Sequence, residues 1–272
     1  VEDELCSLFI DICDVHQRRN VNRSIEQAMA EWPVAIDEAR GRGITRARVA
    51  IYSAWGSNFL GKFGQPYRLK MLAHQIDLLR DRGMEVIEIG LHDSQSFCLP
   101  HEIERDLIEI RRLWPEVRQF HLHMHDARGM ALACLYAALR TLDSDTTVLI
   151  DGTLGGVGGG QYCGNGIASG MVATEDFIHM LEGMGIATGV NLDRLIECVW
   201  MLEDILGMTA FGHVGKAGPR PSVGRLFDPN LPAVESLHAA KHFKLGPQAL
   251  RDEGYSPWKH PITGPWFHVP EP

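Results

Sequence analysis

Three histidines alternate along one short, mostly apolar segment, residues 120–126. His121, His123 and His125 are each separated by a single residue. If the segment is a strand, its side chains alternate between the two faces, so the three imidazoles point to one side. Two neighbouring imidazoles on one face can bind one metal ion. We therefore predict that two neighbouring histidines of this segment are metal ligands. The alternative is that the histidines only hydrogen-bond within the fold.

A glycine-rich loop begins at Asp151. Eight of the sixteen residues 151–166 are glycine, which lets backbone approach a ligand closely or lets a lid move. The loop has neither the G-x-G-x-x-G register of a dinucleotide site nor the Gly-Lys-Ser/Thr of a P-loop. It holds Cys163, a candidate thiol acid or nucleophile, although a lone cysteine is more often inert. A flexible crossover is the alternative for the loop.

Two further polar groups follow apolar runs. Asp93 comes shortly after residues 86–91 and can orient a ligand, act as an acid or base, or cap the next segment. Arg18, Arg19 and Asn20 follow the first apolar run and precede the first predicted helix, where a phosphate or carboxylate of a cofactor can dock. A solvated turn is an equally good interpretation of these three residues.

These groups require a scaffold that brings strand ends together. The first ~206 residues alternate short apolar runs with longer stretches of helical period, which is typical of βα units around a parallel sheet. In such sheets ligand groups collect at the carboxyl ends of the strands. The predicted strands are residues 5–13, 46–53, 86–91, 117–125 and 146–151. The first predicted helix is capped by Ser24 and Gln27 and ends near residue 41 or 43. The other predicted helices are residues 67–82, 101–113, 128–142, 174–184 and 192–206.

Composition excludes several classes of protein. The chain has 272 residues, 45% of them hydrophobic, and a formal net charge of -9, which offers no basic field for nucleic acid. No apolar run approaches the ~20 residues that span a bilayer, and the first residues lack the basic segment of a signal peptide. The six cysteines form no CxxC pair, which argues against a zinc ribbon or a disulfide framework. We expect a soluble protein of a reduced compartment, with no nucleic-acid or membrane partner.

The proline content divides the chain. Ten of the fourteen prolines lie between residues 219 and 272. This shift predicts one domain over residues 1–206 and an irregular Pro/Gly-rich extension over residues 207–272.

Several segments resemble the 3-hydroxy-3-methylglutaryl-CoA lyase branch of the DRE-TIM metallolyases. Residues 123–133, His-Met-His-Asp-Ala-Arg-Gly-Met-Ala-Leu-Ala, are similar to its H-x-H-D-x-x-G-x-A-x-A segment. Residues 18–26 are similar to its K-K-N-I-N-x-S-I-E segment. Residues 173–176, 180–186 and 188–192 resemble its closing segment almost letter for letter. The resemblance extends from about residue 4 to residue 206.

The resemblance implies a fold, an activity and a cofactor. The fold is an α/β TIM (β/α)8 barrel with one Mg²⁺ or Mn²⁺, and the activity is retro-Claisen cleavage of a 3-hydroxyacyl-CoA thioester to acetyl-CoA and a keto acid. His123 and His125 fall on the two metal-binding histidines of the family, and Asp93 falls on its characteristic aspartate. The resemblance therefore implies that His123 and His125 are metal ligands and that His123 also takes part in catalysis. The implied location is cytoplasmic, or mitochondrial in a eukaryote.

The sequence departs from the family at three places. The loop cysteine of the family corresponds to Gly160, with Cys163 three residues later, and its metal-ligating asparagine corresponds to Met171, a poor ligand for a hard cation. We predict that a longer loop re-aims Cys163 and brings Asn165 to the metal. The D-R-E segment of the family has no counterpart near Val1, and the five predicted units match strands 4 to 8 of the barrel.

Three functions are compatible with these observations: a metal-dependent acyl-CoA lyase, a condensing synthase of the same superfamily, or a degenerate barrel segment without catalysis. A five-unit sheet leaves two edges open, which isolated proteins avoid. We therefore expect the missing strands to come from outside this sequence, by homo-oligomerisation or by association with the missing N-terminal barrel segment.

Overall fold

The computed structural model describes residues 4–160, 162–164 and 170–221. The chain divides into two compact units, Val1–Phe177 and Ile178–Pro272. Asn165 and residues 222–272 lie outside the described residues. The domain prediction for residues 1–206 and 207–272 therefore stays a prediction.

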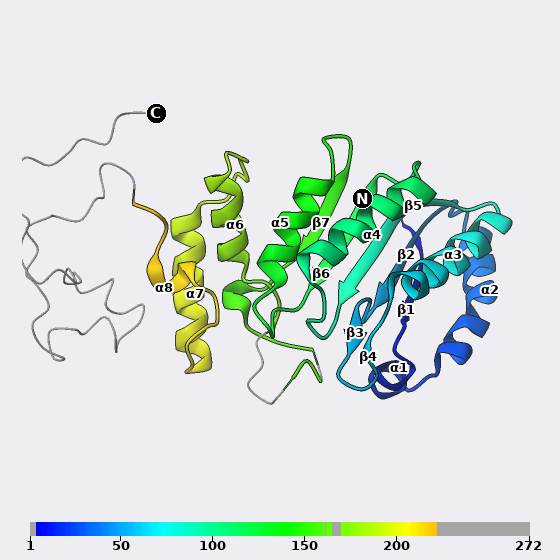
Figure 1. The fold of residues 1–272 in the computed structure, drawn as a ribbon, viewed down its shortest axis with the longest axis horizontal. Helices are drawn as coiled ribbons and strands as arrows, with labels where there is room; N and C mark the ends of the chain where they lie inside the picture. The colour runs from blue at the N-terminus through cyan, green and yellow to red at the C-terminus, as the bar shows by residue number, and fades with distance from the viewer. Residues whose placement is uncertain (1–3, 161, 165–169, 222–272) are drawn as a thin grey trace, which may run out of the picture. The chain divides into compact units, whose positions relative to one another are not determined.

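The first unit is built on a five-stranded parallel sheet (Figure 1). Its order is β1-β2-β5-β6-β7, and each strand pairs in parallel with its neighbours. The strands are β1 (Cys6–Asp11), β2 (Arg46–Tyr52), β5 (Glu85–Asp93), β6 (Gln119–Met124) and β7 (Thr147–Asp151). All five strands predicted from the sequence are present, within a few residues of their expected ends.

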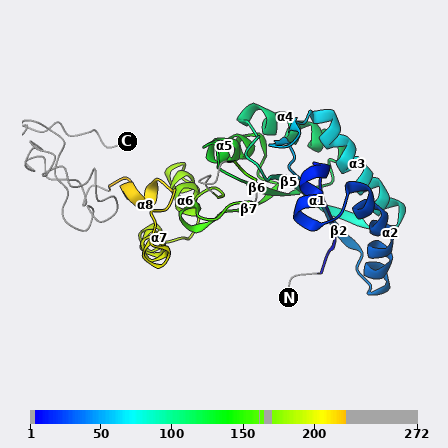
Figure 2. The ribbon, with the colours of Figure 1, turned by 90° about the horizontal axis from the view of Figure 1, so that it is seen from below.

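Helices follow the strands and bury the core against one face of the sheet. They are α2 (Ile25–Gly41), α3 (Gln65–Asp81), α4 (Pro100–Leu113) and α5 (Ala131–Thr141). Figure 2 shows α3, α4 and α5 along the same side of the strands. Ile76 of α3 and Leu107 of α4 are fully buried in the same core cluster as Leu122 of β6. The capping box is also confirmed, because the Ser24 hydroxyl accepts a hydrogen bond from Gln27 N at 3.0 Å.

The other face of the sheet carries the polar side chains. Along β6, Phe120, Leu122 and Met124 are buried, whereas His121 and His123 between them are only partly buried. This alternation is the period-2 pattern that places histidines opposite the helix-covered core.

Sequence analysis missed a helix directly after β1. Residues Asp14–Val21 form helix α1, which ends at Asn22 in the left-handed conformation with a φ of 56°. Arg18, Arg19 and Asn20 therefore lie within a helix, and the solvated turn considered as the alternative for them is wrong. The helix has only eight residues and few apolar ones, so no 3.6-residue hydrophobic period reveals it.

Three short elements complete the loops. Strands β3 (Gly56–Ser57) and β4 (Gly61–Lys62) form an antiparallel hairpin after β2. A 3-10 turn, η1 (Leu154–Gly156), opens the glycine-rich loop after β7.

The second unit is helical in its described part. Helix α6 (Thr174–Gly183) begins in the first unit, and α7 (Leu192–Leu206) and α8 (Val214–Ala217) follow. Asn191 caps α7 by accepting a hydrogen bond from Arg194 N at 3.1 Å. The Trp200 indole donates to Gly215 O at 2.7 Å and so ties α8 to α7.

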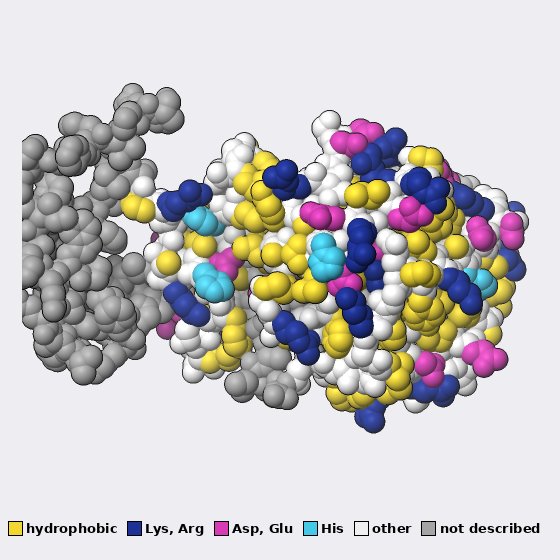
Figure 3. All heavy atoms as spheres, in the orientation of Figure 1, with side chains coloured by type: hydrophobic (Ala, Val, Ile, Leu, Met, Phe, Trp, Pro, Cys, Tyr) yellow, Lys and Arg dark blue, Asp and Glu magenta, His cyan; other side chains and the backbone are white. Residues whose placement is uncertain are grey.

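Charges of both signs are interspersed on the surface. On the face shown in Figure 3, Lys and Arg side chains alternate with Asp and Glu side chains over the described residues. None of the described helices has the length and apolar character that crossing a membrane requires.

Candidate functional site

One row of residues crosses the sheet near the carboxyl ends of its strands. Asp11 pairs in register with Tyr52, His92 pairs with His123, and His123 pairs with Asp151. Residues in register on parallel strands project to the same face. The polar groups at the strand ends thus lie together, as the sequence predicts.

His123 and His125 converge at this edge. The Nε2 atom of His123 lies 3.1 Å from Nε2 of His125. On the other side of the His123 ring, Nδ1 lies 2.8 Å from a carboxylate oxygen of Asp151, which also lies 2.9 Å from His121 Nε2. A carboxylate can only accept, so His123 carries its proton on Nδ1 and directs the lone pair of Nε2 towards His125.

Hydrogen bonding and burial shift the pKa values of Asp151, His121 and His125 from their usual ranges. Hydrogen bonds from His121 and then His123 hold the pKa of Asp151 well below its usual range. The hydrogen bond to Asp151 raises the pKa of His121. Burial, together with repulsion from His123 and His16, lowers the pKa of His125 to about 4. His125 is therefore neutral at pH 7, which is the form that binds metal ions.

Cys163 lies against His125. Its Sγ donates a hydrogen bond to Ser94 O at 3.0 Å and lies 3.2 Å from His125 Nδ1. Gly160 N donates to the same Nδ1 at 3.3 Å. Burial raises the pKa of Cys163, so the side chain is a protonated thiol at neutral pH. The glycine loop thus brings a thiol to the histidine pair.

Asp93 is buried behind this loop. Its two carboxylate oxygens accept hydrogen bonds from Phe97 N and Cys98 N, both at 2.8 Å. Burial raises the pKa of Asp93 to about 6 despite these bonds. Of the roles considered for Asp93, these hydrogen bonds correspond to capping of the turn that follows β5.

His92 lies in the histidine cluster, and the sequence alone assigned it no role. Its ring stacks on His123 with centroids 5.1 Å apart and meets the edge of Tyr52 at 4.3 Å. Among the described residues, neither of its buried ring nitrogens has a hydrogen-bond partner. Burial lowers the pKa of His92 well below its usual range, so a neutral ring packs beside His123.

Sequence analysis also missed Asp11 and His16. The Asp11 carboxylate, at the end of β1, is bonded to Nδ1 of His16 on α1 and accepts a hydrogen bond from Ser53 Oγ at 3.0 Å. A strand ending in Asp with a His five residues later was the available signal. This signal could not be interpreted without helix α1, which brings His16 to Asp11 and which the hydrophobic pattern did not predict.

The predicted anion-binding residues point to different surroundings. Arg18 is exposed and its Nε donates to Asp14 at 2.7 Å. The Arg19 guanidinium lies 5.3 Å from the ring centre of Phe59 and 5.6 Å from that of Tyr162, next to Cys163. Asn20 is exposed. Of the three, Arg19 is the residue in contact with the glycine loop.

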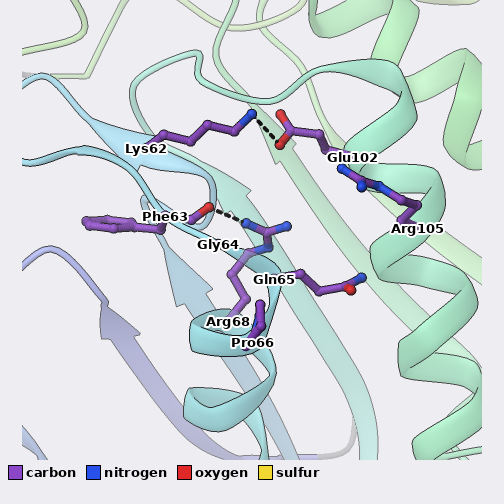
Figure 4. Close-up of a pocket in the computed structure, with 8 residues that line it drawn as sticks. All are labelled: Lys62, Phe63, Gly64, Gln65, Pro66, Arg68, Glu102 and Arg105. Carbon is purple, nitrogen blue, oxygen red and sulfur yellow. Dashed lines mark hydrogen bonds and ion pairs between the residues drawn. The ribbon is translucent and has the colours of Figure 1, made fainter.

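A separate pocket of about 520 Å³ lies where the β3–β4 hairpin meets α3 and α4 (Figure 4). Lys62 pairs with Glu102 at 2.8 Å across it, and Arg68 donates to Phe63 O at 2.8 Å. None of the predicted site residues lines it. The lining residues are Lys62, Phe63, Gly64, Gln65, Pro66, Arg68, Glu102 and Arg105.

The described residues fit a metal ion in part. Two convergent imidazoles can bind a divalent cation, but the described part of the chain contains no group of three or more His, Cys, Asp or Glu side chains that could hold one. Met171, at the position of the family asparagine, forms a β-bridge with His125 and supplies no oxygen ligand. Asn165, the predicted third ligand, lies outside the described residues.

Comparison with known proteins adds a consistent set of relatives. A family model described as HMGL-like matches residues 3–201. Hydroxymethylglutaryl-CoA lyase YngG of Bacillus subtilis is 30% identical over 208 residues, which cover 75% of this chain and 64% of that protein. The (R)-citramalyl-CoA lyase of Chloroflexus aurantiacus is 30% identical over 217 residues, covering 78% and 62%. The chain thus spans less than two thirds of either curated relative.

Solved structures agree with the sequence relatives. An HMG-CoA lyase from Acinetobacter baumannii, in complex with coenzyme A and 3-methylmalate, superposes with a TM-score of 0.67 at 25% identity. The match covers 81% of this chain and 68% of that one. The fold is therefore of the TIM-barrel lyase type, with β1, β2, β5, β6 and β7 as five of its parallel strands.

Proposed function

This chain belongs to the HMGL-like family, and on that premise we propose that it is a metal-dependent carbon–carbon lyase. Its substrate would be a 3-hydroxyacyl-CoA thioester of the 3-hydroxy-3-methylglutaryl type, cleaved to acetyl-CoA and a keto acid. The observation that carries this proposal is the convergence of His123 and His125, whose Nε2 atoms lie 3.1 Å apart at the carboxyl edge of a parallel sheet. Because the chain is similar to both a hydroxymethylglutaryl-CoA lyase and a citramalyl-CoA lyase, the hydroxymethylglutaryl and citramalyl groups are the two candidate acyl groups of the substrate.

His123 and His125 would hold the divalent cation, Mg²⁺ or Mn²⁺, with further ligands such as Asn165. A bound cation would polarise the substrate oxygens and stabilise negative charge on them. Asp151 fixes the ring and tautomer of His123 through the 2.8 Å contact with Nδ1. Cys163 would place a protonated thiol beside His125, within reach of a bound substrate.

The site also offers a place for the anionic part of the substrate. Arg19 lies against Phe59 and Tyr162, beside the thiol-bearing loop. A guanidinium there can pair with a phosphate or carboxylate of an acyl-CoA. We propose Arg19 as the main anion contact, with Arg18 and Asn20 further along the same helix.

We also propose that further strands join this sheet, from a second copy or from another barrel segment. Within the described residues, β1 and β7 each have a neighbouring strand on one side only. Open edges of this kind favour pairing. The six cysteines are all free, and five of them are buried, which supports a reducing compartment such as the cytoplasm or the mitochondrial matrix.

The test is release of acetyl-CoA from 3-hydroxy-3-methylglutaryl-CoA and from citramalyl-CoA with Mg²⁺ or Mn²⁺. We expect release from at least one substrate, loss of release with a chelator, and loss in His123→Ala. The matched control is His101→Ala, which changes an exposed histidine on α4. Consumption of acetyl-CoA with a keto acid would instead identify a condensing synthase. Silence with every acyl-CoA would identify a non-catalytic module.

A further inference from the structure

A second cluster of titratable side chains borders the histidine pair. Asp11 ends β1, His16 lies on α1, and Ser53 follows β2. All three are more than nine-tenths buried. Asp11 Oδ2 is bonded to His16 Nδ1 and accepts Ser53 Oγ at 3.0 Å, while Asp11 Oδ1 accepts Cys13 N at 2.9 Å. A buried carboxylate with this many donors is firmly placed.

The contact with Asp11 decides which nitrogen of His16 can react. Because a carboxylate only accepts, His16 carries a proton on Nδ1. Its Nε2, on the opposite side of the ring, is then the atom that can take up and release a proton. The ring centres of Phe59 and Tyr162 lie 6.5 and 6.0 Å from that of His16 and 5.0 Å from each other, so the imidazole borders a pair of aromatic side chains.

Backbone strain supports the same arrangement. Ser53 adopts a φ of 51°, in the left-handed region that non-glycine residues rarely occupy. Its N–H donates to Ser94 Oγ at 3.1 Å while its hydroxyl reaches Asp11. Such strain persists only where surrounding contacts enforce it, and it concentrates at functional sites.

The cluster faces the candidate metal site. Ser94 accepts a hydrogen bond from Ser53 N through its hydroxyl and one from the Cys163 thiol, at 3.0 Å, through its backbone carbonyl. The Cys163 sulfur lies 3.2 Å from His125 Nδ1. The charge of His16 is among the causes that lower the pKa of His125. His16 therefore lies next to Tyr162 of the loop that carries Cys163 and within electrostatic range of His125.

We propose that His16, positioned by Asp11, is the proton carrier of the cleavage reaction. This inference rests on the lyase activity proposed above. Nε2 of His16 takes the proton of the substrate 3-hydroxyl as the carbon–oxygen bond becomes a carbonyl. The electron pair of the broken carbon–carbon bond leaves as the enolate of acetyl-CoA, and His16 returns the proton to that carbon. Atoms and charge balance without a further reactant. Asp11 acts through His16 and is a positioning residue.

The test separates chemistry from folding by using three variants. His16→Ala should lower kcat by about 10²- to 10⁴-fold, the usual contribution of a general acid–base group, with little change in KM. Added imidazole should restore part of kcat, and more basic substituted imidazoles should restore more. Asp11→Asn should also lower kcat. Added imidazole should not restore kcat in this variant, because the side chain of His16 still occupies the position. His101→Ala is the matched control.

Each result decides the proposal. If the wild type releases acetyl-CoA and folded His16→Ala stays within about threefold of its kcat, the proton-carrier role is wrong while the lyase activity stands. If His16→Ala does not fold, equal kcat in Asp11→Asn and wild type overturns the role of the pair. A metal-loaded wild type that cleaves no acyl-CoA contradicts the lyase proposal itself and this role with it.

Discussion

Asp151 accepts a hydrogen bond from Nδ1 of His123, with 2.8 Å between nitrogen and oxygen, and this contact fixes the direction of the opposite ring nitrogen. Because the two residues are in register on β6 and β7, the contact follows from parallel pairing of the strands. Nε2 of His123 is thereby left with a lone pair that points to His125. A carboxylate behind a metal-binding histidine usually orients the ring and increases its basicity.

Asp151→Asn should weaken binding of Mn²⁺ by about 10- to 100-fold, the usual effect of losing such a partner. The amide removes the charge that His121 and His123 both contact. Titration calorimetry with Mn²⁺ measures the affinity. Asp145→Asn, which changes an exposed partner of Arg118, is the control and should bind like the wild type. Equal affinity in both variants would show that Asp151 does not support a metal ligand.

Asp93 and His125 should give the stability opposite dependences on pH. The pKa of Asp93 is raised to about 6, so the folded state binds this proton more tightly than the unfolded state between about pH 4 and 6. Raising the pH through that window therefore costs stability, on the order of 3 kcal/mol in total. The pKa of His125 is lowered to about 4, so the unfolded state binds its proton more tightly and raising the pH through about 4 to 6.5 adds stability.

Urea unfolding at intervals from pH 4 to 7.5 separates the two groups. In Asp93→Asn the destabilising branch is absent, so stability should rise with pH more steeply than in the wild type. In His125→Gln the stabilising contribution of this residue is absent, so stability should rise with pH less steeply than in the wild type. Curves for both variants that run parallel to the wild type would contradict this account.

The parallel sheet could be predicted because its strands carry their own signal. Residues such as Leu8, Ile51, Ile89 and Phe120 form short apolar runs between longer helical stretches, and all are buried. Helix α1 and the β3–β4 hairpin lack such a signal. Their side chains are mostly polar or exposed, and contacts with distant segments help to fix their conformation, such as the hydrogen bond from Asn58 N to Gln95 Oε1 at 2.7 Å.

Some residues of the candidate site could be predicted from the sequence and others could not. His123 and His125 could be singled out because both lie on one strand, where a spacing of two residues specifies a shared face. Asp11, His16 and Ser53 come together only after β1 and β2 pair and α1 folds back on them. Sequence separations of 5 and 42 residues between partners carry no local periodicity. Parallel pairing of distant strands is what creates the cluster.

Gly160→Ala should disturb the histidine pair directly. A Cβ atom at this position would lie 2.8 Å from His125 Cε1 and 3.1 Å from Cys163 Sγ, both shorter than ordinary contact. The imidazole must move, and overpacking of this kind typically costs 1–3 kcal/mol. We expect Mn²⁺ affinity to fall by about tenfold or more. Gly41→Ala, where no atom lies within 4 Å, is the control. Unchanged metal binding in Gly160→Ala would mean that the loop and His125 are not in contact.

Asp106 should be a major determinant of stability, because it binds two residues drawn in Figure 4, Gln65 and Arg68. Its buried carboxylate pairs with Arg68 at 2.8 Å and accepts Trp55 Nε1 at 2.8 Å and Gln65 Nε2 at 3.0 Å. Asp106→Ala leaves the buried Arg68 guanidinium without its counter-charge, and breaking a buried pair from one side usually costs about 3–5 kcal/mol. Urea unfolding should show this loss.

The control for Asp106 is Asp143→Ala, which breaks an exposed pair with Arg111. Solvent screens that pair, so its unfolding midpoint should stay close to that of the wild type. Because the network of Asp106 joins the hairpin after β2 to α3 and α4, its loss should loosen this region before it reaches the histidine pair. Hydrogen exchange should therefore quicken first at residues 55–68 in Asp106→Ala. Equal unfolding midpoints for the two variants would show that the buried network does not stabilise the fold.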